Sequence, residues 1–138
     1  MSLSQDIITS SLYRLNPAPT KDYDCIESCF EAASSCWICV DACLNEKDNS
    51  HLKDCIKLSL RCAEVCASTA RMLIFQADYS REEILDQVKA CRDLLKLCSD
   101  ECGLHGETHE HCFISARSAL ECLRNCDNFL ERSLALEA

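Results

Sequence analysis

The sequence predicts an all-α fold, an antiparallel four-helix bundle with a cysteine-lined core, preceded by a short N-terminal helix. Three observations lead to this prediction. Fourteen of the 138 residues are cysteines, and most successive cysteines lie three, four or seven positions apart, on one face of a helix. Two glycines and two prolines leave long segments without a helix breaker. The polar connections between these segments are short, so successive helices should be antiparallel neighbours.

The first twenty residues are predicted to stand apart from the bundle. Asn16 and Pro17 end a short amphipathic helix, and residues 16–20 form a linker. The chain therefore divides into an N-terminal helix with its linker, residues 1–20, and a bundle domain, residues 21–138. The apolar residues that indicate the N-terminal helix are Leu3, Ile7, Ile8, Leu12 and Leu15.

Turn and capping residues place the bundle helices. In the polar turn 45–50, Asp48, Asn49 or Ser50 can cap the second helix. Ser80 with Glu83 fits a capping box, a glycine stop follows the third helix, and a threonine can cap the fourth. The helices are expected from about 22 to 44, from the 45–50 turn to about Gln76, from Ser80 to about Gly103, and onward from Thr108.

Composition excludes several classes of protein. A cysteine content of one residue in ten is typical of small secreted proteins held together by disulfides. Those proteins are rich in loops, whereas this chain is predicted to be helical. No secretory signal or membrane span is visible, so we expect a cytoplasmic protein whose thiols stay reduced. The net charge of −9 disfavours nucleic acid and anionic membranes as partners. No catalytic constellation stands out, so no enzyme is expected.

The cysteines form four seams, one on each predicted helix. The repeated unit is the C-x3-C pair, which places two sulfurs one helical turn apart. Two helices share the frame C-x6-C-x3-C, and in the same frame Ala32 and Ser115 stand where a cysteine could. The predicted metal ligands are Cys25, Cys29, Cys36, Cys39 and Cys43, then Cys55, Cys62 and Cys66, then Cys91, Cys98 and Cys102, then Cys112, Cys122 and Cys126.

Softness and coordination number favour copper(I) as the cargo. Zinc and iron–sulfur sites usually have four ligands, often supplied by C-x2-C motifs in turns. The single C-x2-C of this sequence, Cys36/Cys39, lies within a predicted helix. Copper(I) accepts two or three thiolates, which suits i, i+4 pairs. If each copper(I) replaces one thiol proton the core charge is unchanged, so we expect multiple ions, nearly one per cysteine. A zinc-binding protein is the alternative, and a thiol redox buffer a weaker one because the pairs lie away from helix N-termini.

Histidines and apolar residues complete the prediction. His51, His105, His109 and His111 should meet at one end of an up-down bundle, where imidazoles can pass copper to thiolates, so they are possible entry-port ligands. Apolar side chains beside the seams are expected to close the bundle around the sulfurs. They are Ile26, Phe30, Trp37, Val40, Ile56, Leu60, Leu73, Leu94, Leu97, Phe113, Leu120, Leu123 and Phe129.

The run of C-x3-C pairs, together with the H-x3-H-x-H-C segment from His105 to Cys112, resembles the cysteine-rich four-helix-bundle copper storage proteins of bacteria, in their cytosolic branch. The resemblance covers about residues 22–130. It implies a thiolate-lined bundle that holds many copper(I) ions, often assembled as a homo-oligomer of four chains. It also implies that the fourteen cysteines store copper and that the three histidines of that segment lie at the mouth. The copper donor or acceptor is not indicated.

Overall fold

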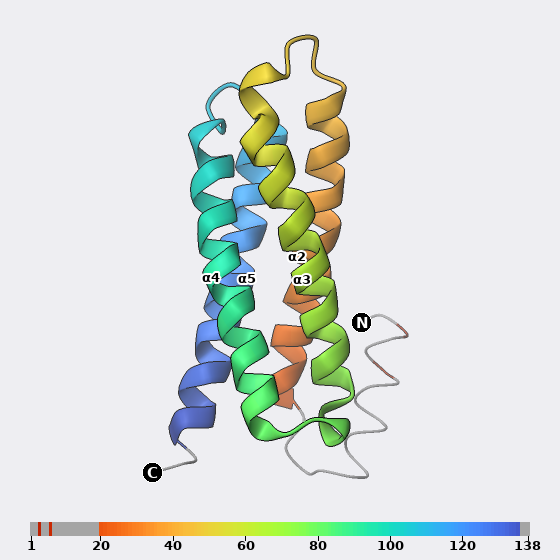
Figure 1. Ribbon diagram of the computed structural model, residues 1–138, viewed down its shortest axis with the longest axis vertical. Helices are drawn as coiled ribbons and strands as arrows, with labels where there is room; N and C mark the ends of the chain where they lie inside the picture. The colour runs from red at the N-terminus through yellow and green to blue at the C-terminus, as the bar shows by residue number, and fades with distance from the viewer. Residues whose placement is uncertain (1–2, 4–5, 7–19, 136–138) are drawn as a thin grey trace.

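The computed structural model of the protein describes residues 3, 6 and 20–135. Within them, four α-helices form an antiparallel bundle, as the sequence predicts, and no strand occurs (Figure 1). The predicted N-terminal helix lies outside the described residues except at positions 3 and 6, so that helix and the division at residue 20 stay predictions. The bundle helices are α2 (Thr20–Leu44), α3 (Lys53–Ile74), α4 (Arg81–Leu104) and α5 (Glu110–Ala135).

Each helix packs against its two neighbours around a closed ring. The sequential pairs α2–α3, α3–α4 and α4–α5 are in contact, and α5 returns to lie beside α2. The turns 45–49 and 105–109 therefore lie at one end of the bundle, with the chain reversal 75–80 at the other (Figure 1). No helix in the described part of the chain is long and apolar enough to cross a membrane.

The start of α4 follows the prediction, whereas the start of α3 differs. The capping box is confirmed: Glu83 N–H donates to Ser80 Oγ at 3.1 Å and Ser80 N–H donates to Glu83 Oε1 at 3.1 Å. The predicted cap of the second helix is wrong, because a 3₁₀ turn, η1 (Ser50–Leu52), precedes α3. Asp48 instead accepts hydrogen bonds from the backbone and hydroxyl of Ser50.

Around the third connection the expected capping also differs. The Thr108 hydroxyl donates to the carbonyl of His105 at 3.3 Å, so it closes the turn after α4 and does not cap α5. Gly103 lies within the last turn of α4 and not beyond it, since that helix runs to Leu104. Its φ is not positive, so the end of α4 needs no left-handed glycine. A second 3₁₀ turn, η2 (Gln76–Asp78), follows α3.

The apolar residues beside the seams divide into two groups. Ile26, Val40, Leu73, Leu94 and Phe129 are buried, and Ile56 and Leu123 pack against the core. The prediction was wrong for the others, because the cysteines occupy the central stripe of each helix and residues farther round face outward. The exposed members are Phe30, Trp37, Leu60, Leu97, Phe113 and Leu120.

The capping box gives a stability prediction. Substituting Ser80→Ala removes the side-chain acceptor for the Glu83 N–H and should lower the free energy of unfolding by about 1 kcal/mol. Urea unfolding of the reduced, copper-free protein measures it. Ser80→Thr keeps the acceptor and should retain most of the stability. Equal losses in the two variants would show that the loss of stability does not come from the hydroxyl acceptor.

Candidate metal centre

The four cysteine seams meet on the bundle axis. All fourteen cysteines are free thiols, and none is more than 2% exposed. A thiol interior of this kind follows from the helical spacing, because positions that share one face of a helix point into the same core. The sulfurs that the sequence places on separate helices therefore come within reach of one another.

Three sulfurs near the 45–49 and 105–109 turns form a nearly equilateral triangle. The Sγ–Sγ distances are 3.9 Å for Cys39–Cys43, 4.0 Å for Cys39–Cys112 and 3.9 Å for Cys43–Cys112. The centre of such a triangle lies about 2.3 Å from each corner, which is the length of a metal–thiolate bond. The side chains of these three residues are thus spaced for one trigonal metal ion without movement.

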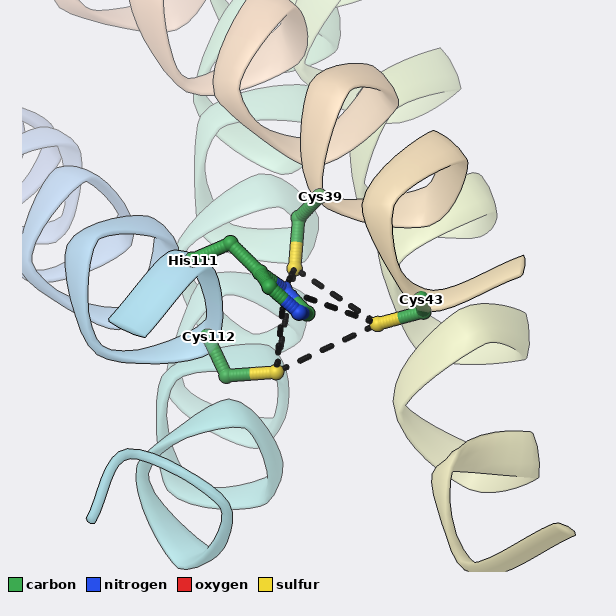
Figure 2. Close-up of side chains that lie close together, drawn as sticks. All are labelled: Cys39, Cys43, His111 and Cys112. Atoms are coloured by element: carbon green, nitrogen blue, oxygen red, sulfur yellow. Dashed lines mark hydrogen bonds between the residues drawn. The ribbon is translucent and has the colours of Figure 1, made fainter. Parts of the chain in front are cut away.

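His111 lies beside this triangle and directs a ring nitrogen toward it (Figure 2). Its Nδ1 is 3.5 Å from the sulfurs of Cys39 and Cys112 and 3.9 Å from that of Cys43. These four ligand atoms all lie within 4.8 Å of one another. The triangle and this nitrogen, which we call the mouth site, can therefore offer three sulfurs alone or three sulfurs and one nitrogen.

The sulfurs continue from the mouth site toward the middle of the bundle. Cys36, Cys62 and Cys98 come from three helices, and their sulfurs lie within 4.8 Å of one another. Cys62 also lies 3.8 Å from Cys66, whose sulfur is in turn 3.8 Å from that of Cys91. Each of these distances is close to the separation of about 4 Å expected between two thiolates on one ion.

A further group lies toward the opposite end. Cys25, Cys29 and Cys126 offer three sulfurs within 4.8 Å of one another. The sulfurs of Cys25 and Cys126 are 3.9 Å apart, and those of Cys29 and Cys122 are 3.6 Å apart, both across the α2–α5 contact. Neighbouring groups share helices and lie in succession, so the thiols form a continuous column.

One hydroxyl group lies inside the thiol column. Ser59 is fully buried, and its Oγ lies 3.6 Å from the sulfur of Cys102, 3.9 Å from that of Cys98 and 4.0 Å from that of Cys55. The sulfurs of Cys55 and Cys102 are only 3.2 Å apart. Sequence analysis missed Ser59, although its position four residues after Cys55 and three before Cys62 places it in the seam.

The two frame positions without cysteine are also in the core. Ala32 and Ser115 are buried, so each occupies the place of a potential thiol. The Ser115 hydroxyl makes no hydrogen bond within the described residues. Leaving a buried hydroxyl without a partner is unfavourable by about 1–3 kcal/mol.

Proximity and burial alter the acidity of the thiols. Hydrogen bonding to Cys122, followed by smaller contributions that include burial, raises the pKa of the Cys66 thiol. Hydrogen bonding with Cys39, and next with Cys55, lowers the pKa of Cys102. Most of the shifts along the column raise the thiol pKa, as for Cys55, Cys98 and Cys126, and so favour the protonated form.

The four histidines converge above the mouth site. The Nε2 atoms of His51 and His109 are 3.1 Å apart, and the ring centroids of His51 and His105 are 5.8 Å apart. His109 and His111 have ring centroids 5.4 Å apart. His105 Nε2 is paired with Glu101 Oε2 at 3.3 Å. The structure therefore brings all four predicted histidines to one end.

A carboxylate joins two of these histidines. Glu46 Oε1 lies 3.1 Å from His109 Nδ1 and 3.0 Å from His111 Nε2. The hydrogen bond from His111 lowers the pKa of Glu46, and His109 adds to the effect. Sequence analysis missed Glu46 because no local pattern links residue 46 to residues 109 and 111.

The opposite end of the bundle is closed by apolar side chains. The cysteines of α3 and α4 stop short of that end, where buried Leu73, Val88 and Leu130 pack together with the rest of the apolar core. The nearest polar pair there, the Gln87 amide donating to Thr69 Oγ1 at 3.0 Å, is satisfied internally. Among the described residues, the histidines therefore gather at one end of the sulfur column and the aliphatic cluster at the other.

Comparison with known proteins assigns the chain to a family. Residues 18–131 match the sequence profile of Csp, the copper storage protein family. The chain belongs to the copper storage protein family. The bundle architecture predicted from the cysteine spacing is the architecture of solved copper storage proteins.

Two solved structures and one sequence relative illustrate the similarity. The copper storage protein Ccsp of Streptomyces lividans, loaded with 10 copper equivalents, is 33% identical, with a TM-score of 0.82 over 88% of this chain and 96% of that one. A cytosolic copper storage protein from the same organism with five coppers is 34% identical, with a TM-score of 0.79 over 81% and 93%. The cysteine-rich protein YhjQ of Bacillus subtilis is 31% identical over 74% of this chain and 89% of its own length.

Burial of the thiols predicts slow chemical labelling of this copper storage family member. We expect the reduced, copper-free protein to react with N-ethylmaleimide at least about tenfold more slowly than the same protein unfolded in guanidinium, because buried, protonated thiols are poor nucleophiles. Mass mapping should find Cys39, Cys43 and Cys112 labelled first. Native labelling at the unfolded rate would contradict the closed core.

Proposed function

We propose that this chain stores many copper(I) ions on cysteine thiolates inside the bundle, for copper storage or detoxification, and that it is not an enzyme. The observation that carries the proposal is the sulfur triangle of Cys39, Cys43 and Cys112, with sides of 3.9–4.0 Å. Copper(I) is a soft ion that accepts three thiolates in a plane. The fourteen cysteines are the proposed storage ligands, since the sulfur spacing recurs along the column.

Charge neutrality sets the expected capacity. A thiolate that remains uncompensated in a bundle core is very unfavourable. If each copper(I) replaced one thiol proton, about fourteen ions would leave the core as neutral as it was before loading. Sharing of sulfurs between neighbouring ions is supported by the continuity of the column, in which Cys66 lies 3.8 Å from both Cys62 and Cys91.

Zinc is the competing cargo, and the geometry limits where it could bind. The mouth site offers three cysteines and one histidine, a set that suits zinc as well as copper. The interior groups differ, because Cys36, Cys62 and Cys98 provide three mutually close sulfurs and no nitrogen. A soft ion of low coordination number fits these groups better. A thiol redox buffer is disfavoured because the sulfurs are buried.

The histidines are the proposed entry port. His51, His105, His109 and His111 lie at the end where the sulfur column begins, and His111 Nδ1 approaches the mouth site directly. Imidazole nitrogen binds copper, so an ion held there would have thiolates within a few ångströms. At the opposite end the described residues present an aliphatic cluster around Leu73, Val88 and Leu130, and no histidine.

The assembly we propose is a homo-oligomer of four chains in the cytoplasm. A groove of about 380 Å³ between α2 and α5 carries both acids and arginines, so a second copy related by a two-fold axis could pair arginine with glutamate. Ile114 in this groove is 55% exposed. Nucleic acid and membranes are not proposed as partners, given the net charge of −9. The groove is lined by Ser28, Glu31, Ser35, Ile114, Arg117, Ser118, Leu120, Glu121 and Arg124.

An anaerobic titration tests the storage function. We expect the reduced protein to bind more than about ten copper(I) ions per chain against a competing chelator, with about one proton released per ion. Zinc should occupy about one site, at the mouth. Cys122→Ser should lower the copper capacity, whereas Ser115→Ala, a change in the same seam without a thiol, should not.

Other outcomes of this titration have distinct meanings. Saturation near seven ions with about two protons released per ion would contradict sharing of thiolates. Saturation at about three ions, or displacement of bound copper by zinc, would contradict copper storage itself.

Self-association gives a separate prediction. Light scattering coupled to size exclusion should give the mass of about four 15.5 kDa chains for the copper-free protein. Ile114→Asp places a charge in the α2–α5 groove and should shift the protein to smaller species with its helix content unchanged. Leu104→Asp, an exposed position at the end of α4, is the matched control. A monomeric wild-type protein would overturn the assembly proposal.

A further inference from the structure

Glu46 makes contacts that the proposed entry port does not require. It follows the end of α2, and only one of its two oxygens, Oε1, is within hydrogen-bond distance of both histidines. The two histidines approach this oxygen through different ring atoms, His109 through Nδ1 and His111 through Nε2. A single acceptor therefore contacts two imidazoles in opposite orientations.

The chemistry of the carboxylate fixes where the protons lie. An ionised carboxylate only accepts hydrogen bonds, so each nitrogen that faces Glu46 must carry the proton. In a neutral imidazole the other nitrogen then holds the lone pair. For His111 that nitrogen is Nδ1, which lies 3.5 Å from the sulfurs of Cys39 and Cys112. For His109 it is Nε2, which lies 3.1 Å from His51 Nε2.

We propose that Glu46 is a positioning residue that sets opposite tautomers in His109 and His111, so that one presents a metal-binding nitrogen to the outer histidines and the other presents one to the mouth site. The proposal rests on the proposed copper function for its purpose, but not for its geometry. Carboxylates that orient metal-binding histidines are frequent in proteins, and losing one typically weakens metal affinity or activity 10–100-fold. Here one carboxylate orients two.

The alternative roles of Glu46 are less consistent with the contacts. As a ligand, its Oε1 would have to leave both imidazoles, and a hard oxygen is a poor match for copper(I). If Glu46 contributed only negative charge, its exact position would matter little, because other carboxylates lie at the same end of the bundle. Glu107 is one of these, exposed in the 105–109 turn and without a hydrogen bond or ion pair among the described residues.

Three variants separate orientation from charge. Glu46→Ala removes the acceptor and the charge, while Glu46→Gln removes the charge but keeps an oxygen that can accept from both rings. Glu107→Ala removes one charge from the same end of the bundle and leaves both histidines untouched. If Glu46 positions the rings, Glu46→Gln should behave more like the wild type than like Glu46→Ala.

The direct test uses the reduced, copper-free protein. Long-range ¹H–¹⁵N correlation spectra, recorded at about pH 8, distinguish the two neutral tautomers of each ring. We expect His111 as the Nε2–H form and His109 as the Nδ1–H form in the wild type, Glu46→Gln and Glu107→Ala, and mixed tautomers in Glu46→Ala. Unchanged tautomers in Glu46→Ala would overturn the proposal.

Copper uptake gives a second readout. In stopped-flow mixing with a copper(I)–chelator complex, Glu46→Ala should slow binding of the first equivalents about tenfold or more and leave the final capacity unchanged. Equal slowing in Glu46→Gln and Glu107→Ala would show that charge alone acts, and would overturn the positioning role. If no variant binds copper, the storage function fails, while the tautomer result still decides the role of Glu46.

Discussion

Fourteen thiols share a core from which water is excluded, and burying a thiolate there without a compensating charge is very unfavourable. Much of the architecture is consistent with this constraint. In the metal-free state hydrogen bonding among the sulfurs and burial keep most thiols protonated, as the raised pKa of Cys66 illustrates. A monovalent soft cation that takes the place of a proton leaves the total charge unaltered. The same column can thus be neutral when empty and neutral when full.

Ordinary helix packing maintains the bundle and brings the thiols together. Four helices with an aliphatic end, including Leu73 and Val88, supply apolar burial, and the capping box at Ser80 fixes the start of α4. Sulfurs from different helices are then held 3.6–4.0 Å apart, at Cys29–Cys122 and between Cys112 and the two α2 cysteines of the mouth site. Because the coordinating thiols are already in place, less conformational entropy is lost when a metal ion binds.

The features that depend on periodicity could be predicted from the sequence. Those that depend on contacts between distant residues could not. The seams and the bundle follow from spacings of three, four and seven, and Ser80 with Glu83 carries a local signal. Thr108 was misassigned because its hydroxyl reaches back to His105, a choice made by the shape of the turn. Trp37 was expected to be buried because it is apolar, but it is 44% exposed. Hydrophobicity alone does not show which edge of a wide apolar stripe faces a neighbouring helix. Glu46 was missed because its partners are more than sixty residues away.

The apolar closure opposite the histidines has a consequence for the order in which stored ions exchange. In the described part of the chain the aliphatic cluster around Leu73, Val88 and Leu130 offers no metal ligand, so ions would enter and leave the sulfur column at the histidine end. Stored ions would then move along the column one after another. An ion bound near Cys25 and Cys126 could leave only after the ions nearer the histidine end had left. In such a column the last ion to bind would be the first to dissociate. The mouth site would therefore govern turnover, while the deep cysteines would hold a slowly exchanging reserve.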